Sequence, residues 1–191
     1  MSELSEIDGR RQRGERSKRA IVDSALALIE DGVLVPTAQQ VSDGAGVAMR
    51  TFFRHFNDMD SLFAAIDEAT RGRMASLFNT EVPEGSLPDR IEAVVRDRGR
   101  AYEGVKNLAL STQALLWRSS YLRQQYAANQ RLLRRDLEKR LPEIASLDTE
   151  PRESAHAIAS IEMWGRLRNH QGLTPTASVA LVSGMLKRLI S

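Results

Sequence analysis

The segment from Thr37 to Phe56, TAQQVSDGAGVAMRTFFRHF, constrains the fold of this chain more than any other segment. Thr37 is a good helix N-cap, and Gln40 follows three residues later, which is the spacing of a capping box. The two glycines of Gly44-Ala45-Gly46-Val47 then allow a tight turn. Phe52 and Phe56 stand four residues apart, so both can pack against the preceding helix. The segment therefore predicts two short helices joined by a tight turn.

The second of these helices is expected to begin near Ala48 and to carry long polar side chains on its outer face. Arg50 and Arg54 are four residues apart and share one helical face. Arginine pairs bidentately with guanine, and a helix–tight turn–helix with such a second helix is the form that enters a DNA major groove. The alternative is that these charges only form a solvated face.

The candidate DNA contacts are of different kinds. Arg50 and Arg54 are expected to bind bases, while Ala48 and Met49 are expected to touch thymine methyls or sugar edges. Hydroxyl, amide and imidazole side chains are expected to bind phosphate, which the dipole at a helix N-terminus also favours. The predicted DNA-binding set is Thr37, Gln39, Gln40, Ala48, Met49, Arg50, Thr51, Phe53, Arg54 and His55.

Two short motifs in this segment resemble a known family. Ala45-Gly46-Val47 and Thr51-Phe52-Phe53-Arg54-His55-Phe56 are similar to the signature of TetR-family (tetracycline-repressor-like) transcriptional regulators, and the similarity extends over about Ser17 to Leu62. The chain departs from the family pattern at three positions. Ala48 stands where a capping Ser is usual, Phe53 where Tyr is frequent, and Met59 where Lys is common. Each departure removes a cap or a phosphate contact that the resemblance would otherwise imply.

Composition sets broad limits on the class of protein. The chain has 191 residues, 42% of them hydrophobic, and it has no cysteine, which leaves neither a disulfide framework nor a thiolate metal site. The formal net charge of +2 is too small to indicate a nucleic-acid partner by itself. No apolar stretch approaches the roughly 18 residues of a membrane span, and no signal peptide is recognisable. We therefore expect a cytoplasmic protein without membrane contact.

The basic residues are concentrated near the N-terminus. A run of six basic residues is interrupted by a single acid, Glu15; it consists of Arg10, Arg11, Arg13, Arg16, Lys18 and Arg19. Residues 1–14 also contain Gly9 and Gly14 and lack hydrophobic periodicity, so we expect a disordered basic arm there. Such an arm attracts phosphates through counterion release, or it is merely a solvated tail.

Apolar residues recur at helical spacing along the rest of the chain, without β-alternation. The predicted fold class is all-α with about nine helices. A three-helix head over 15–57 contains the helix-turn-helix, and a larger helical domain over 58–191 follows. The resemblance implies that this larger domain binds a small molecule and dimerises.

Aromatic side chains of the larger domain are the candidates for the ligand pocket that the resemblance implies. Trp117 and Tyr121, four residues apart, are expected on its wall, with Arg118 as an anchor for an anionic ligand and Tyr102 and Met163 nearby. The alternative is that these side chains belong to the core.

The last two helices are expected to form a dimer interface, as two helices from each copy can build a four-helix bundle. Alternatively, their apolar stripes face the chain's own core. The candidate interface residues are Ile158, Ile161, Trp164, Val179, Val182 and Leu186.

Enzyme activity is not expected. Glu153-Ser154-Ala155-His156 has the spacing found in helical di-iron sites, but such a site needs a second copy of the motif, which is missing. No phosphate-binding loop, dinucleotide motif or nucleophile elbow is present. A helical adaptor would leave the Thr37–Phe56 segment unexplained. The sequence favours a homodimeric regulator, most simply a repressor, that binds a palindromic double-stranded operator and is released by a small-molecule effector of unspecified identity, with no cofactor and no metal.

Overall fold

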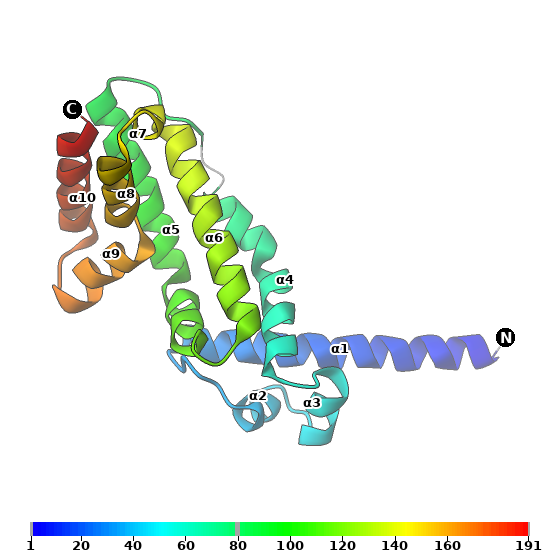
Figure 1. The fold of residues 1–191 in the computed structure, drawn as a ribbon. Coiled ribbons are helices and arrows are strands. Elements are labelled where there is room, and N and C mark those ends of the chain that lie inside the picture. The colour runs from blue at the N-terminus through cyan, green and yellow to red at the C-terminus, as the bar shows by residue number, and fades with distance from the viewer. Residues whose placement is uncertain (1, 79–80, 191) are drawn as a thin grey trace. The chain divides into compact units, whose positions relative to one another are not determined.

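The computed structural model describes residues 2–78 and 81–190, with side chains described from Arg11 onward. These residues form ten α-helices and one π-helical segment, and they contain no strand, so the predicted all-α fold is confirmed with one helix more than expected (Figure 1). The helices are α1 (Ser2–Glu30), α2 (Ala38–Gly44), α3 (Met49–His55), α4 (Met59–Phe78), α5 (Leu87–Leu115), α6 (Ser120–Arg140), α7 (Pro142–Ala145), α8 (Thr149–Ile158), α9 (Ile161–Gly165), η1 (Arg166–His170) and α10 (Pro175–Ile190).

The N-terminal basic segment is helical where the sequence led us to expect disorder. Helix α1 begins at Ser2 and continues without a break to Glu30 (Figure 1). Leu, Glu, Arg, Gln and Lys, which dominate this segment, are strong helix formers, and each interrupting glycine costs only about 1 kcal/mol. Adding residues to a helix that already exists also avoids a new nucleation step. The expectation of a disordered arm over 1–14 is therefore wrong for the described residues, and Met1 lies outside them.

The chain forms two compact units. The first unit comprises the chain up to Gly72 together with Asn107–Tyr126. The apolar faces of α1 to α4 meet in its core, and the facing ends of α5 and α6 complete it. The buried core residues are Ile21, Val22, Ala25, Ile29, Val41, Phe52, Phe56, Leu62, Phe63, Ile66, Leu115 and Leu122.

This first unit is larger than the head predicted over 15–57. Leu62, Phe63 and Ile66 of α4 are each at most 6% exposed, and they share one core with Phe52 of α3. Three short helices offer little apolar surface, and small domains bury too little of it to be stable alone. The fourth helix and the α5 and α6 ends supply the missing surface.

The second unit comprises Arg73–Lys106 and the chain from Ala127 onward. Apolar residues of α5, α6, α7, α8, η1 and α10 form its core, with the end of α6 followed closely by Pro142 at the start of α7. The buried core residues are Ile91, Val94, Val95, Leu137, Leu141, Ile144, Ala155, Ala159, Leu167, Val182 and Leu186.

Two arginines are buried within this second unit. The Arg140 side chain is 2% exposed and donates from Nη2 to Asp97 Oδ2 at 2.6 Å. The Arg98 side chain is 6% exposed and donates from Nη1 to Asp136 Oδ2 at 3.0 Å. Because a buried charge is costly unless it is paired and hydrogen-bonded, both pairs are requirements of the folded unit.

Candidate nucleic-acid interface

The capping box predicted at the start of α2 is present. Gln40 N donates to Thr37 Oγ1 at 3.2 Å, and Thr37 N donates to Gln40 Oε1 at 2.9 Å. The neighbouring Gln39 amide donates to Asp43 Oδ1 at 2.7 Å. Thr37, Gln39 and Gln40 are all exposed at this helix end, and the Thr37 and Gln40 side chains also bind the backbone there.

The turn between α2 and α3 depends on both of its glycines. A Cβ at Gly44 would lie 2.5 Å from Ser24 Oγ, so any side chain there would force this hydroxyl to move. Ser24 Oγ itself donates to Val41 O at 2.9 Å and ties the two helices together. Gly46 has φ +65°, in the left-handed region that favours glycine. The direction in which α3 leaves the turn is therefore fixed by local geometry.

Helix α3 is held by its inner face. Phe52 is 0% and Phe56 2% exposed, and their ring centroids lie 5.8 Å apart. Ala48 occupies the N-cap position with extended backbone angles and provides no side-chain hydrogen bond. The helix is consequently anchored by packing rather than by its cap.

The outer face of α3 carries the two arginines predicted to bind bases. Arg50 and Arg54 are exposed, and neither forms an ion pair with any described residue. Phe53 lies beside them, 51% exposed, with its ring edge-on to Phe52 at 5.3 Å between centroids. Ala48 is also exposed at the start of the helix. The arrangement leaves both guanidinium groups available to a partner in solution.

Three other predicted contacts are only partly accessible: Met49, Thr51 and His55. Ser42 Oγ donates to Met49 Sδ at 3.2 Å, so this sulfur lies in the packing between α2 and α3. A thymine contact by Met49 is therefore not favoured by its placement.

His55 lies between α3 and α1. A Cβ at Gly14 of α1 would lie 3.9 Å from His55 Cε1, and His55 Nε2 is buried without a hydrogen-bond partner among the described residues. Burial, together with the charges of Arg54 and Lys18, lowers the pKa of His55, although Glu15 acts in the opposite direction. The imidazole is thus neutral near neutral pH, which makes it a weaker phosphate contact than a charged side chain.

The basic part of α1 lies next to this surface. Helix α1 crosses α3 near Gly14 and continues beyond it (Figure 1). Five cationic residues of α1, before and after Gly14 in the sequence, are exposed: Arg11, Arg13, Arg16, Lys18 and Arg19. Together with Arg50 and Arg54 we call them the basic residues of the head, and their charge suits the phosphates of nucleic acid.

The residues predicted for the wall of a ligand pocket lie in and beside the turn between α5 and α6. Trp117 is 80% exposed, and it lies with Arg118 in a turn between α5 and α6. The turn arises because Ser119 Oγ accepts from Leu122 N at 3.0 Å and starts a new helix. Tyr121 packs against the first core and donates to Asp67 Oδ2 at 3.4 Å. None of the three lines the recess described below, and their part in ligand binding stays a prediction.

Three residues predicted to form a dimer interface are buried inside one chain. Trp164, Val182 and Leu186 are at most 6% exposed within the second unit. Ile158, Ile161 and Val179 are half-buried. The apolar stripe of α10 therefore serves the chain's own core, which is the alternative that periodicity alone left open.

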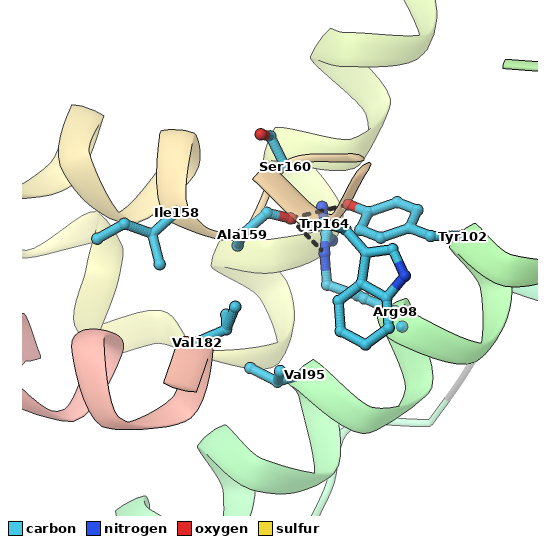
Figure 2. A pocket seen from close by; sticks show the side chains of 9 residues that line it. Val95, Arg98, Tyr102, Ile158, Ala159, Ser160, Trp164 and Val182 are labelled. Carbon is cyan, nitrogen blue, oxygen red and sulfur yellow. Dashed lines mark hydrogen bonds between the residues drawn. The ribbon is translucent and has the colours of Figure 1, made fainter. Parts of the chain in front are cut away.

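A narrow recess lies within the second unit instead (Figure 2). Of the predicted ligand residues it includes Tyr102, whereas Met163 packs against the second core. The recess also includes Arg98, which the sequence-based prediction missed. A signal existed, because Arg98 falls at helical spacing within the apolar series Ile91, Val94, Val95, Ala101, Tyr102 and Val105, where a charge is unusual.

The Glu153–His156 pair does not belong to a metal centre. Glu153 binds Arg134, with Nη1 of Arg134 donating to Oε2 at 2.8 Å, and His156 Nε2 lies 2.8 Å from Glu138 Oε1. Among the described residues no group of three or more His, Asp and Glu side chains could hold a metal ion. The described helices also include none whose length and apolarity would suit a bilayer crossing.

Comparisons with known proteins support the fold. No model of a known protein family matches the chain, and no curated protein matches it in sequence. The structure is similar to the crystal structure of a transcriptional regulator from Rhodococcus sp. Rha1, with a TM-score of 0.64 and 17% identity over 93% of this chain and 95% of that one. It is also similar to a proposed transcriptional regulator from Pseudomonas aeruginosa PAO1, with a TM-score of 0.62 and 18% identity over 95% and 91% of the two chains. At such identities the likeness shows a shared fold.

Proposed function

We propose that this protein is a TetR-like, sequence-specific DNA-binding regulator of transcription. The observation that carries the proposal is the pair Arg50 and Arg54, exposed and without ion-pair partners among the described residues, on a helix whose opposite face is buried through Phe52 and Phe56. An arginine pair held rigidly on the second helix of a helix-turn-helix suits recognition of guanines in a major groove. The regulators that share its fold, and the resemblance of residues 45–56 to the TetR signature, support the same function.

The basic residues of the head would supply the sequence-independent part of the affinity. Each phosphate neutralised by Lys or Arg releases counterions, and the affinity then falls steeply with salt. The cations of α1 are carried on a helix and need no ordering when they bind. They also compensate for Phe53 and Met59, which cannot bind phosphate as the Tyr and Lys of the resembling family would.

A homodimer is the simplest form in which such a head binds a palindrome, because two recognition helices roughly 34–36 Å apart fit one DNA turn. Since Val182 and Leu186 are buried in the chain itself, the outer face of α10 is the better candidate for the interface. There Ala177, Ala180 and Leu181 are exposed, and Leu181 retains 40% exposure. A Leu181→Glu change is expected to convert the dimer to a monomer in light scattering.

We further propose that the regulator is a repressor released by a small molecule bound in the second unit. A ligand shifts such an equilibrium only by its different affinity for the DNA-bound and free forms. The resemblance of residues 45–56 to the TetR signature supports this part of the proposal.

The test is fluorescence anisotropy with DNA from upstream of the protein's own gene and, where that fails, with fragments selected by the protein from genomic DNA. A scrambled duplex is the control, and two salt concentrations separate base recognition from phosphate attraction. We expect the selected duplex to bind at least about a hundredfold more tightly than the scrambled one. The double change Arg50→Ala with Arg54→Ala should abolish this preference, whereas Arg166→Ala, at an exposed position of η1 in the second unit, should not. Equal and steeply salt-dependent binding to every duplex would contradict the proposal.

A further inference from the structure

Phe53 is an exposed aromatic side chain on the outer face of α3. Its ring keeps 51% of its surface exposed, although Phe52 and Phe56 of the same helix segment are buried. Covering apolar surface that is in contact with water is favourable. The ring lies outside the described core, and it has no polar atom that could bind phosphate. Neither packing nor the proposed phosphate contacts therefore account for it.

The ring shares its surface with the two arginines proposed to bind bases. Arg50 precedes Phe53 by three residues, and residues three apart are neighbours on a helix surface. Arg54 follows Phe53 directly, and both arginines are exposed. A partner that binds both guanidinium groups would consequently cover the ring as well.

The orientation of the ring is restricted by its neighbour. It meets Phe52 edge-on, with the ring centroids 5.3 Å apart and the ring planes at 80°. Phe52 is itself 0% exposed and packs against Phe56. Because the ring already has a fixed neighbour and only two rotatable bonds, it loses little conformational freedom when a partner covers it.

The other apolar groups at this helix are less suited to contact a partner. Met49 is half-buried, and its sulfur accepts from Ser42 Oγ at 3.2 Å. Ala48 is exposed at the N-cap but offers a single methyl group. Among the described residues of α3, Phe53 is the one large apolar side chain that is exposed.

A DNA major groove contains one apolar group that such a ring can contact. Base edges there present hydrogen-bond donors and acceptors, whereas thymine also presents its C5 methyl group, which apolar side chains including Phe contact. Residues three apart on a helix are about 4.5 Å apart along its axis, and successive base pairs are about 3.4 Å apart. The Phe53 ring would therefore lie about one base-pair step from a guanine bound by Arg50.

We propose that Phe53 is a specificity-determining residue that recognises the C5 methyl group of a thymine next to the guanine bound by Arg50. The ring covers the methyl group and excludes water from it, so a base without this methyl group binds less tightly at that position. The inference rests on the proposed function, because it requires α3 to lie in a major groove. It adds to guanine a second chemical group that the helix reads.

Replacement of thymine by deoxyuridine tests this contact, because it removes the methyl group and retains the base pair and the O4 acceptor. Each thymine of the duplex selected by the full-length protein is replaced in turn, and binding is measured by anisotropy. We expect deoxyuridine at one thymine of each half-site to weaken binding about fourfold, as for the loss of one buried group of this size. Replacement of the other thymines should have little effect.

Variants of the protein assign the methyl contact to the ring. Phe53→Ala should bind the thymine and deoxyuridine duplexes equally, because the contact is absent in both cases. Phe53→Leu keeps an apolar side chain and should retain the preference for thymine. Val35→Ala is the matched control, since Val35 is 42% exposed but lies before α2, and it should leave the preference unchanged. If Phe53→Ala does not fold, Phe53→Gln removes the apolar surface at similar side-chain length.

Each result decides the assignment. The assignment is supported by a thymine preference that disappears in Phe53→Ala and persists in Phe53→Leu. It is overturned if no thymine of the selected duplex is sensitive to deoxyuridine, or if the sensitivity persists in a folded Phe53→Ala variant, since another residue would then contact the methyl group. Both of these results leave the proposed function intact. A protein that prefers no duplex over the scrambled control would refute the proposed function and the assignment together.

Discussion

The arginines of the two compact units are used in opposite ways. In the first unit, Arg50 and Arg54 are exposed on α3 and form no ion pair with any described residue. In the second unit, Arg140 and Arg98 are at most 6% exposed and bind Asp97 and Asp136 across helices. An exposed arginine contributes little to folding, and a buried paired one is unavailable to a partner such as DNA. Side chains of one chemical type can thus serve recognition in one unit and stability in the other.

The largest expected effect is the loss of a buried pair. Arg140→Ala leaves Asp97 without its buried partner, and we expect the free energy of unfolding to fall by about 3 kcal/mol, the lower end for such a change because Asp97 keeps some exposure. Urea unfolding measures this. Arg100→Ala is the matched control: Arg100 binds the same carboxylate at 2.9 Å but is 73% exposed, so the expected loss is below about 1 kcal/mol. Equal losses for the two variants would mean that burial does not distinguish these arginines.

The second effect tests the other side of the comparison. Arg50→Ala is expected to cost about 1–3 kcal/mol in binding to the selected duplex, and to relax the preference at one base position. The free energy of unfolding should change by less than about 0.5 kcal/mol, because the side chain is exposed. Anisotropy with duplexes that vary one base pair at a time, together with urea unfolding, gives both quantities. A uniform loss on all duplexes would assign Arg50 to phosphate.

A smaller effect concerns the uncapped start of α3. Ala48 already has the extended angles of an N-cap, φ −69° and ψ 149°, so Ala48→Ser is expected to add about 1 kcal/mol to the free energy of unfolding. Ala180→Ser, at an exposed position inside α10, adds no cap and should not stabilise. Thermal unfolding of both variants provides the comparison. A lack of stabilisation by Ala48→Ser would show that packing of Phe52 and Phe56 alone sets the start of α3.

The smallest effect is a dependence of stability on pH in the second unit. Burial lowers the pKa of His156, and the hydrogen bond with Glu138, which acts in the opposite direction, does not overcome it. The unfolded chain, with a histidine pKa of about 6.5, then binds more protons than the folded chain in mild acid. The stabilisation from neutral His156 is complete above that pH and is lost as the pH falls below it. His156→Gln should flatten the decline of the melting temperature between pH 7.5 and 5.5, whereas His170→Gln, at an exposed position, should leave its slope unchanged.

The parts of the molecule that the sequence predicts correctly are those determined by near neighbours. The capping box of Thr37 and Gln40, the left-handed Gly46 and the buried Phe52 and Phe56 each depend on residues a few positions away. Propensity and periodicity describe such local features well.

The errors have a different origin, because they involve a choice between distant partners. Periodicity shows that Val182 and Leu186 are apolar on one face, but it does not specify whether that face meets the chain's own core or a second copy. Trp117 lies in a turn, which its spacing from Tyr121 does not reveal, because the Ser119 cap divides one apolar pattern into two helices. The basic segment of α1 is helical because helix propagation from an anchored neighbour outweighs two glycines.

The continuity of the long helices has a consequence for how such a protein can evolve. The boundaries between the two units fall inside helices α4, α5 and α6, so each of these helices belongs to both units. A gene segment ending at residue 57 would encode the residues proposed to contact DNA but not Leu62, Phe63, Leu115 and Leu122, which complete their core. A single recombination junction after residue 57 would therefore transfer this head without part of its core. New binding preferences would have to arise by substitutions on the outer face of α3, with the rest of the chain inherited alongside.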